Sequence, residues 1–380
     1  MYQVSAVGCD SYNESEVYSA LSKAIEVIGG LDNIKEGTKV AIKANLVTFM
    51  KPDKAATTHP VMLCALVKML KERGAEVVIG DSPGGLYNAA FVNKVYSVTG
   101  MSEAVKVGAR LNDDYSQGEA TFEEAKIAKQ FTYTAFLDKA DVIINFCKLK
   151  SHGMMGMSAA VKNMFGTIPG TIKPEYHFKY PQQSDFANML VDLNEYFKPT
   201  LNIVDGVIGM EGNGPTQGNP RKIGVVLASK SPYIVDRVCA HIIGMKPDEV
   251  PTVKAAAERN LCPERLEDID IFGDVDKFVV SDFDVIKVSK NLQFYGNSAF
   301  GKLRGKLFEA CLSSKPVLKS NLCIGCNECG KICPAKAITM VNKKAKIERA
   351  KCIKCFCCQE FCPKGAMKVG RTPIAKLLNK

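Results

Sequence analysis

The chain has 380 residues, of which 46% are hydrophobic and 24% charged, and its formal net charge is +10. These are ordinary values for a globular protein, and the length fits one large domain plus a smaller one. No stretch approaches the roughly 18 apolar residues of a membrane span, and the N-terminal residues lack the pattern of a signal peptide. We therefore expect a cytoplasmic protein without a membrane span.

Apolar strands and helices alternate over most of the chain. In order, we expect a strand at 2–7, a helix at 14–28, a strand at 39–47, a helix at 59–73 capped by Thr58, strands at 76–80 and 141–146, helices at 157–165 and 184–197, strands at 201–204 and 223–228, a helix at 232–243 and a short strand at 270–272. This alternation is typical of an open, largely parallel α/β sheet with helices on both faces. Residues 111–136 are less regular and indicate an antiparallel insertion.

The pattern changes toward the C-terminus, which divides the chain into four parts. We expect an α/β body at 1–288, a linker at 289–319, a small α+β domain at 320–370 and a basic tail at 371–380. Phe300, Leu303, Leu307 and Cys311 fall at helical spacing, so the linker is predicted to contain an amphipathic helix that lies on the body.

Nine of the fifteen cysteines lie between Cys323 and Cys362, and eight of the nine form two runs of Cys-x₂-Cys-x₂-Cys-x₃-Cys-Pro. This is the bacterial ferredoxin motif, in which the fourth cysteine of each run binds the other cluster. The domain is therefore predicted to bind two [4Fe–4S] clusters. The expected ligands of cluster I are Cys323, Cys326, Cys329 and Cys362, and those of cluster II are Cys352, Cys355, Cys358 and Cys333.

Zinc sites and disulfides fit the spacing of these cysteines poorly. Zinc ribbons use two Cys-x₂-Cys pairs rather than runs of four, and a disulfide framework would spread its cysteines through the fold. Cys357 stands beside Cys358 as an extra thiol and is expected not to be a ligand. The six scattered cysteines are expected to be small buried hydrophobic residues.

Positive charge is concentrated in the cysteine-rich part. Residues 315–380 contain thirteen lysines and two arginines against three glutamates, a net charge of +12, which leaves −2 for the rest of the chain. No RNA- or DNA-binding motif accompanies this charge, so nucleic acid is not expected as a partner. The clusters would offset part of the excess, and the remainder predicts an acidic redox protein as a partner.

Polar residues follow several of the predicted strands at their carboxyl ends. In an open α/β sheet, ligands bind at these ends, near the point where the strand order reverses. Lysines beside helix N-termini favour an anion such as a carboxylate or phosphate. The sequence thus predicts a cleft for a small anionic ligand, with Lys150 and His152 as catalytic residues. The predicted binding residues are Lys43, Asn45, His59 and Asp81.

Each of these residues also has a plain structural interpretation. His59 could cap or pack the helix that it begins, and single lysines are often solvated. The glycine-rich stretch from Gly206 to Gly214 follows a strand but runs into Pro215 instead of a helix, so it is interpreted as a loop at the sheet edge. Contact with a ligand is the alternative for that loop.

Short motifs across Thr38–Gly244 resemble the domain of unknown function 362 family, which is often fused to a two-cluster ferredoxin. They are Lys-Ala-Asn-Leu-Val at 43–47, Thr-Thr-His-Pro at 57–60, Gly-Asp-Ser-Pro at 80–83, Lys-Leu-Lys-Ser-His at 148–152, Ala-Val-Lys-Asn-Met-Phe-Gly at 160–166 and Val-Asp-Gly at 204–206. The resemblance implies a fold but no common reaction. The segment that begins with Thr-Thr-His-Pro also looks like the N-terminal domain of lactate racemase, over too short a stretch to imply nickel or racemase activity.

The leading hypothesis is an iron–sulfur redox protein of anaerobic metabolism. Its clusters would pass low-potential electrons to or from the anion in the body, and a two-electron reaction would use both clusters or an additional flavin. A second hypothesis is a carrier or redox sensor whose body docks on a separate oxidoreductase. A third is a cluster or cofactor assembly factor, for which the spare cysteines are the only hint.

Overall fold

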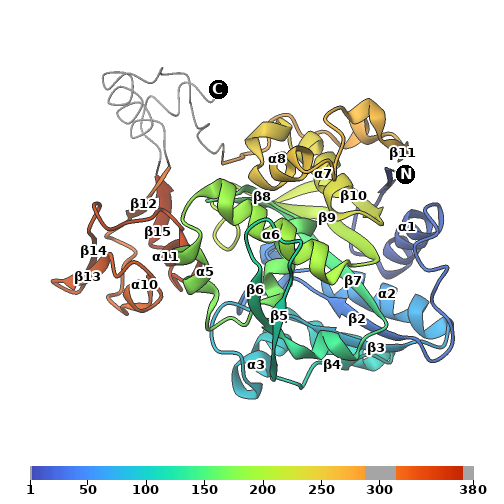
Figure 1. Cartoon of the computed structure of the whole chain (residues 1–380), viewed down its shortest axis with the longest axis horizontal. Helices are drawn as coiled ribbons and strands as arrows, with labels where there is room; N and C mark the ends of the chain where they lie inside the picture. The colour runs from blue at the N-terminus through green and yellow to red at the C-terminus, as the bar shows by residue number, and fades with distance from the viewer. Residues whose placement is uncertain (1, 287–313, 371–380) are drawn as a thin grey trace.

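The computed structural model describes residues 2–286 and 314–370, which form an α/β body and a small cysteine-rich domain beside it (Figure 1). The strands of the body are β1 (Gln3–Gly8), β2 (Lys39–Lys43), β3 (Glu76–Gly80), β4 (Arg110–Leu111), β5 (Gln117–Thr121), β6 (Gln130–Thr134), β7 (Val142–His152), β8 (Gly156–Ser158), β9 (Leu201–Glu211), β10 (Asn219–Ser229) and β11 (Asp270–Phe272). Its α-helices are α1 (Glu14–Glu26), α2 (Pro60–Glu72), α3 (Ala89–Thr99), α4 (Ala160–Asn163), α5 (Lys173–Lys179), α6 (Gln183–Phe197), α7 (Pro232–Ile242) and α8 (Pro251–Glu258). Among the described residues, no helix is both long and apolar enough to cross a membrane.

The body contains one nine-stranded sheet with the order β11-β1-β10-β9-β7-β2-β3-β4, and β8 pairs with β7. The pairs β2–β3, β2–β7, β3–β4, β7–β9 and β1–β11 are parallel, whereas β10 runs antiparallel to both of its neighbours. The prediction of a largely parallel sheet is therefore confirmed. From β2 the chain passes to β3 on one side and later returns to β7 on the other, so the strand order reverses between β2 and β7.

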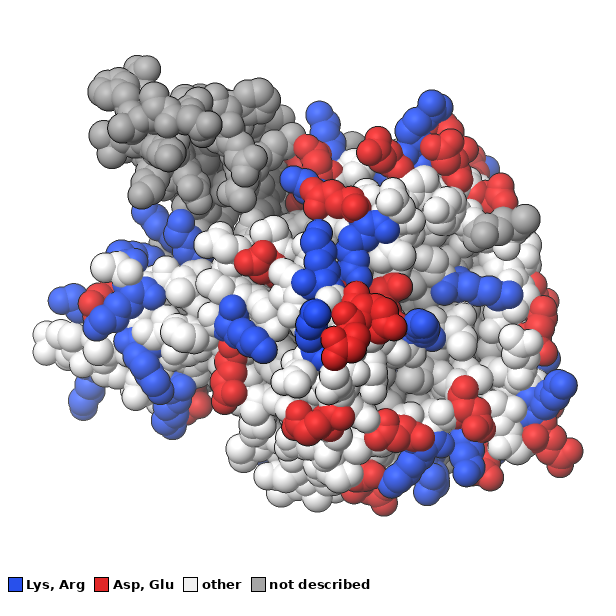
Figure 2. Space-filling view, in the orientation of Figure 1, with Lys and Arg blue, Asp and Glu red and all other residues white. Residues whose placement is uncertain are grey.

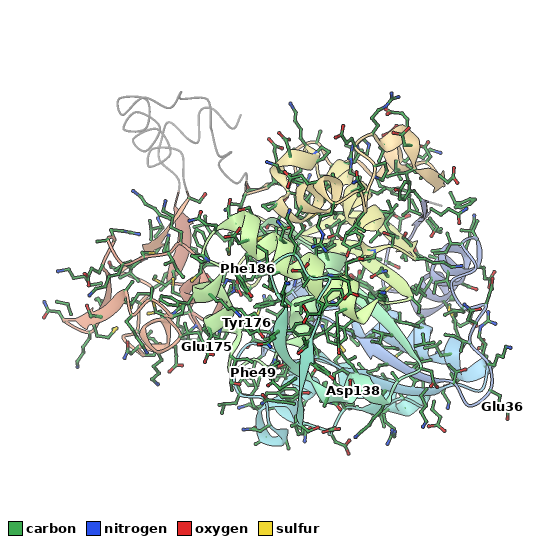
Figure 3. All side chains as sticks on the ribbon, in the orientation of Figure 1. Glu36, Phe49, Asp138, Glu175, Tyr176 and Phe186 are labelled. Carbon is green, nitrogen blue, oxygen red and sulfur yellow. The ribbon has the colours of Figure 1, made fainter. Side chains whose placement is uncertain are left out.

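Helices cover both faces of this sheet, as expected. On one face α1, α2 and α3 enclose a core that includes Leu21, Leu63 and Val92. On the other face α6, α7 and α8 enclose a core that includes Phe186 and Val235 (Figure 3). Burial on both faces explains why the strands read as continuous apolar runs.

The N-terminus of α2 differs from the prediction in its cap. His59 occupies the cap position, and its Nδ1 accepts a hydrogen bond from the backbone N–H of Val61 at 3.4 Å. The hydroxyl of Thr58 instead joins two strand ends, because it accepts from Asn45 N at 3.0 Å and donates to Phe146 O at 2.7 Å. Thr58 therefore ties the end of β2 to β7.

Strand β7 is longer than the sequence indicated. It continues beyond Phe146 to His152, and residues 156–158 form β8 rather than the start of a helix. Lys148 and Lys150 concealed this extension, because lysines are rare in buried strands. Both are nevertheless about 1% exposed, and their ammonium groups are paired inside the protein. The extension carries β7 directly into the candidate site.

The region at 111–136 contains the antiparallel pair β5–β6. The small domain consists of β12 (Lys315–Leu318), α10 (Glu328–Lys331), β13 (Ile338–Val341), β14 (Lys344–Ile347), α11 (Cys357–Glu360) and β15 (Met367–Gly370). Because β12 pairs with β15, this domain begins within the segment that the sequence assigned to the linker. The helix predicted at Phe300–Cys311 and the basic tail lie outside the described residues.

Candidate functional site

The cysteine-rich domain contains a small cavity of about 20 Å³ beside α10. Its lining includes the four cysteines that the sequence assigned to cluster I, namely Cys323, Cys326, Cys329 and Cys362. Backbone N–H groups point at the sulfurs, as the N–H of Ala366 does toward Sγ of Cys362 at 3.2 Å. Thiolate ligands of a cluster accept such hydrogen bonds. The residues present therefore fit a [4Fe–4S] cluster.

The second set of cysteines gathers around the same small core. Cys333 and Cys358 are buried in it, and Cys352 packs against it. Burial raises the pKa of Cys352, and the neighbouring thiols of Cys355 and Cys333 raise it further, which places these three side chains close together. The described residues contain no group of three or more His, Cys, Asp or Glu arranged to hold a single metal ion.

The two cysteine loops share an unusual backbone. Asn327 and Phe356, the residues that follow the second cysteine of each run, have φ of 64° and 63°. Gly325 and Lys354, which precede that cysteine, have φ of 76° and 57°. Non-glycine residues seldom adopt this conformation. Its recurrence at matching positions shows that both loops are shaped in the same way.

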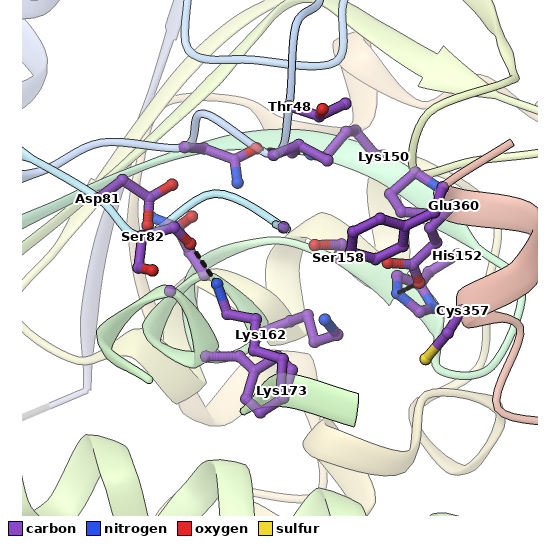
Figure 4. A pocket seen from close by; sticks show the side chains of 18 of the residues that line it. Thr48, Asp81, Ser82, Lys150, His152, Ser158, Lys162, Lys173, Cys357 and Glu360 are labelled. Carbon is purple, nitrogen blue, oxygen red and sulfur yellow. Dashed lines mark hydrogen bonds and ion pairs between the residues drawn. The ribbon is translucent and has the colours of Figure 1, made fainter. Parts of the chain in front are cut away.

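A second cavity, which we call the interdomain pocket, lies where the body meets the cysteine-rich domain and has a volume of about 90 Å³ (Figure 4). Body residues come from the ends of β2, β3 and β7 and from the segment that includes α4 and α5. The cysteine-rich domain contributes one wall through α11 and Phe361. The lining residues are Asn45, Val47, Thr48, Asp81, Ser82, Gly84, Lys150, His152, Ser158, Lys162, Asn163, Phe165, Gly166, Lys173, Pro174, His177, Pro215, Cys357, Glu360 and Phe361.

A buried ion pair supports one side of the interdomain pocket. Nζ of Lys43 lies 2.7 Å from Oδ1 of Asp81, and Oδ2 of Asp81 accepts from the backbone N–H of Leu46 at 2.7 Å. Gly166 packs directly on this pair, because a Cβ there would lie 2.0 Å from Oδ1 of Asp81 and 2.4 Å from Nζ of Lys43. Asp81 is thus neutralised by Lys43 before any ligand binds.

Three further lysines line the interdomain pocket. Lys150 donates to Oδ1 of Asn45 at 2.5 Å and to the carbonyl of Ala56 at 2.7 Å. Lys173 donates to the carbonyl of Ser82. Within the part of the chain that the structure describes, Nζ of Lys162 has no hydrogen-bond or ion-pair partner. Burial lowers the pKa of Lys150 and of Lys173 to about 7, and it also lowers that of Lys162.

His152 stands at the boundary between the two domains. Its Nδ1 accepts from the backbone N–H groups of Met154 and Met155 at 3.1 and 3.2 Å, so its proton is on Nε2, which lies 3.3 Å from Oε1 of Glu360. Burial and the charge of Lys162 lower the pKa of His152. Burial alone would raise the pKa of Glu360, but the contact with His152 and nearby positive charge outweigh it and lower that pKa to about 2. His152 is therefore a neutral donor facing a carboxylate.

Five buried polar atoms of the lining have no hydrogen-bond partner among the described residues, and three of these are in the ion-pair contacts Lys43–Asp81 and His152–Glu360. The other two, Nδ1 of His177 and Oδ1 of Asn163, have neither kind of partner. The His177 ring stacks on Phe186 with a centroid distance of 4.4 Å, and burial lowers the pKa of His177 to about 3. An unsatisfied buried polar group costs about 1–3 kcal/mol, so such atoms mark a place where a ligand can bind.

The stretch after β9 docks the two domains. Asn213 accepts from Gln359 Nε2 through its carbonyl at 2.8 Å and from Val369 N through Oδ1 at 3.0 Å. Thr216 donates to the carbonyl of Glu360 at 3.2 Å, and Gln217 donates to the carbonyls of Gln359 and Cys362. The glycine-rich stretch interpreted as a sheet-edge loop thus continues β9 to Glu211 and then enters the domain interface.

The structure brings together most of the residues predicted from the strand ends. Asn45, Asp81, Lys150 and His152 line the interdomain pocket, and Lys43 lies beneath it in the ion pair with Asp81. The prediction that His59 joins these residues at the ligand cleft is wrong. Its ring stacks on Tyr12 at 3.6 Å and its backbone N–H donates to Asp205. As the cap of α2 it is turned toward a neighbouring buried cluster that also holds Lys148.

Sequence reasoning missed most of the pocket lining, including the titratable residues Lys173, His177 and Glu360. Lys173 and His177 lie on the short helix α5, whose sequence lacks the apolar periodicity that would predict a helix. Glu360 lies between two cysteines of the metal-binding motif, and nothing in that motif predicts that its side chain lines a pocket. Only the placement of α11 against the body shows its role.

Comparisons with known proteins agree with this two-part architecture. A family model described as a domain of unknown function (DUF362) matches residues 40–241, and one described as a 4Fe-4S dicluster domain matches residues 315–363. The chain is 31% identical over 267 residues to "Thylakoid-associated protein sll1697" of Synechocystis sp., an alignment that covers 70% of this chain and 81% of that protein.

Two solved structures match part of this chain. The lactate racemase apoprotein from Thermoanaerobacterium thermosaccharolyticum matches with a TM-score of 0.37 and 11% identity, over 60% of this chain and 54% of that one. A protein from Thermotoga maritima matches with a TM-score of 0.34 and 13% identity, over 57% and 55% of the two chains. This chain thus spans about half the length of each. The family model and the aligned relative lead to one assignment: the chain belongs to the domain of unknown function (DUF362) family and carries a 4Fe-4S dicluster domain at its C-terminal side.

Proposed function

We propose that this chain is an iron–sulfur redox protein in which two [4Fe–4S] clusters exchange low-potential electrons with a small anion bound in the interdomain pocket. The observation that carries the proposal is the position of α11. This helix contributes Cys357 and Glu360 to the pocket lining, and it also contains the expected cluster ligand Cys358. The reacting ligand and cluster II would therefore lie on two sides of the same short helix.

The residues that would hold the clusters are those expected from the motif. Cluster I would be bound by Cys323, Cys326, Cys329 and Cys362, and cluster II by Cys352, Cys355, Cys358 and Cys333. When bound, such clusters supply single electrons at low potential, so a two-electron reaction would draw on both or on an added flavin.

The protein side chains would bind the anion and supply protons. Lys150, Lys162 and Lys173 provide positive charge where burial limits contact with water, so that electrostatic attraction is stronger than in bulk water. Nε2–H of the neutral His152 can donate a hydrogen bond to the ligand, and Lys150, whose pKa burial lowers to about 7, can supply a proton. Asn45 positions Lys150 by accepting its hydrogen bond.

The outer side of the cysteine-rich domain is suited to an acidic redox protein. Leu322, Ile324 and Val341 are 43%, 61% and 47% exposed near the cluster I cysteines. Lys344 lies in the same region and donates to the carbonyl of Cys323, while the carbonyl of Lys343 approaches Gly325. Figure 2 shows lysines and arginines over this domain, at the left of the view. An apolar centre with a basic rim matches a partner that carries surface carboxylates.

We place this activity in the cytoplasm. The fourteen cysteines in the described part of the chain form no disulfide with one another, which suits a reducing compartment. An anaerobic setting follows from the oxygen sensitivity expected of clusters at low potential.

The test begins with anaerobic purification, iron and sulfide analysis, and mass spectrometry of released small molecules, which would also reveal a flavin. The clusters are then reduced with dithionite, and their reoxidation by candidate small anions is followed by absorption and electron paramagnetic resonance. We expect one class of anion to reoxidise them. If fully loaded clusters react with none, the pocket is not a site of redox chemistry and the carrier or sensor hypothesis takes its place.

A further inference from the structure

The charges around the interdomain pocket are unbalanced before a ligand binds. Lys150, Lys162 and Lys173 line it, whereas the carboxylates among its described lining residues are Asp81 and Glu360. Asp81 is already paired with Lys43 at 2.7 Å. One carboxylate therefore faces three lysines, a difference of two charges. Buried charge without compensation is costly, so a ligand with two negative charges suits this site best.

The positive groups are divided between two walls. Lys162 and Lys173 both lie over the ring of Phe165, at 4.9 and 5.8 Å from its centroid, and so share one wall. Lys150 and His152 are two residues apart on β7 and therefore face the same side of that strand. In Figure 4, Lys150 lies above the cavity and Lys162 and Lys173 lie below it. Charge is thus offered at two separate points.

Uncommitted hydrogen-bonding groups surround the same space. Nζ of Lys162 has no hydrogen-bond or ion-pair partner among the described residues, and neither Nδ1 of His177 nor Oδ1 of Asn163 has one. His177 and Asn163 are each only 3% exposed, so water satisfies them poorly. An oxygen atom of a ligand could accept from Nζ of Lys162 and from Nδ1 of His177 when that nitrogen carries the ring proton, whereas Oδ1 of Asn163 would need a donor.

We infer that the interdomain pocket, in the role given to it by the proposed function, binds a short dicarboxylate. One carboxylate is held by Lys162 and Lys173, and the other by Lys150 and Nε2–H of His152. A compact dianion such as inorganic phosphate would satisfy only one wall. The cavity volume of about 90 Å³ limits the ligand to a small molecule.

The test uses the full-length, cluster-loaded protein in its oxidised state, so that binding is measured without electron transfer. Titration calorimetry compares succinate, malonate, butyrate and inorganic phosphate. We expect a dicarboxylate to bind at least tenfold more tightly than butyrate and phosphate. Lys162→Gln should weaken dicarboxylate binding at least tenfold and leave the iron content unchanged. The matched control is Lys254→Gln, which changes an exposed lysine on α8 and should have no effect.

A second variant, Lys173→Gln, guards against loss of folding in the first, and thermal unfolding of both variants is measured beside the wild type. Equal affinity for succinate and butyrate would overturn the inference, as would preferential binding of phosphate or no binding of any probe. Dicarboxylate binding without any reoxidation of reduced clusters would instead contradict the proposed function and leave the binding inference standing.

Discussion

Nε2 of His152 lies 3.3 Å from Oε1 of Glu360, and this contact joins the last residue of β7 to the last residue of α11. The histidine belongs to the α/β body and the glutamate to the cysteine-rich domain. A structural change in either domain that moves one of these side chains therefore alters the lining of the interdomain pocket. Its position between the expected cluster II ligands and the lysines makes it the first target for mutagenesis.

Replacing His152 should separate turnover from cluster binding. In His152→Gln a side-chain oxygen remains near the backbone N–H groups of Met154 and Met155, but the Nε2–H that donates a hydrogen bond to the ligand is lost. We expect reoxidation of reduced clusters by the ligand to slow about 10²-fold or more, within the usual range for a lost hydrogen-bond donor to developing charge. Iron content should stay at the wild-type value. A variant that loses iron instead would show that His152 serves the domain interface alone.

Cysteine substitutions should distinguish ligands from the extra thiol. The wild-type chain is expected to bind about eight irons, with two interacting cluster signals when reduced. Cys355→Ala should lose or convert one cluster, whereas Cys357→Ala should retain both, because Cys357 lines the interdomain pocket. Iron analysis and electron paramagnetic resonance measure both outcomes. Equal damage in the two variants would refute the ligand assignment.

Electron exchange with an acidic redox protein should depend on salt. The 315–380 region carries a net charge of +12, and the Debye length falls to about 8 Å at physiological ionic strength. With an acidic flavodoxin as the probe, stopped-flow rates should fall as salt rises. The double substitution Lys343→Glu and Lys344→Glu should reduce both the rate and its salt dependence, whereas Lys254→Glu on the body should not. A rate that is indifferent to salt would exclude this mode of docking.

Gly166 should be intolerant of a side chain. A Cβ there would lie 2.0 Å from Oδ1 of Asp81, so Gly166→Ala must displace the buried ion pair with Lys43. Overpacking of this kind costs about 1–3 kcal/mol, which denaturant unfolding would measure. The control is Gly8→Ala, where the new Cβ would meet only the ring of Phe278 at 3.7 Å. Equal stability of the two variants would contradict the packing described for Gly166.

Anion binding should weaken as pH rises through neutrality. Burial lowers the pKa of Lys150 to about 7, and the amine must be protonated to attract an anion. Below that pH the lysine is charged, and above it the charge is lost, so affinity should fall between about pH 6 and about pH 8. Lys150→Arg, which stays charged throughout, should show a smaller slope in calorimetry. An unchanged slope would assign the titration to another group, with Lys173 as the next to test.

The sequence supported the fold and the metal motif better than the pocket. Strand β3 and helix α6 were expected within one residue of their ends, because apolar runs and turn residues mark them clearly. The extension of β7 through Lys148 and Lys150 could not be predicted from the sequence, because a lysine is expected to be buried only when its partner is known. Glu360 and Lys173 line the same pocket from distant parts of the chain, and no local sequence pattern predicts this.

The docking of the cysteine-rich domain relies largely on main-chain atoms. Thr216 and Gln217 bind the carbonyl oxygens of Gln359, Glu360 and Cys362, and these carbonyls belong to the shape of the cysteine loop rather than to its side chains. Substitutions on the surface of that domain can therefore accumulate without changing how it docks on the α/β body. A different ferredoxin with the same loop backbone, grafted in its place, should sit in the same orientation and could change the driving force of the reaction while the ligand chemistry stays with the host.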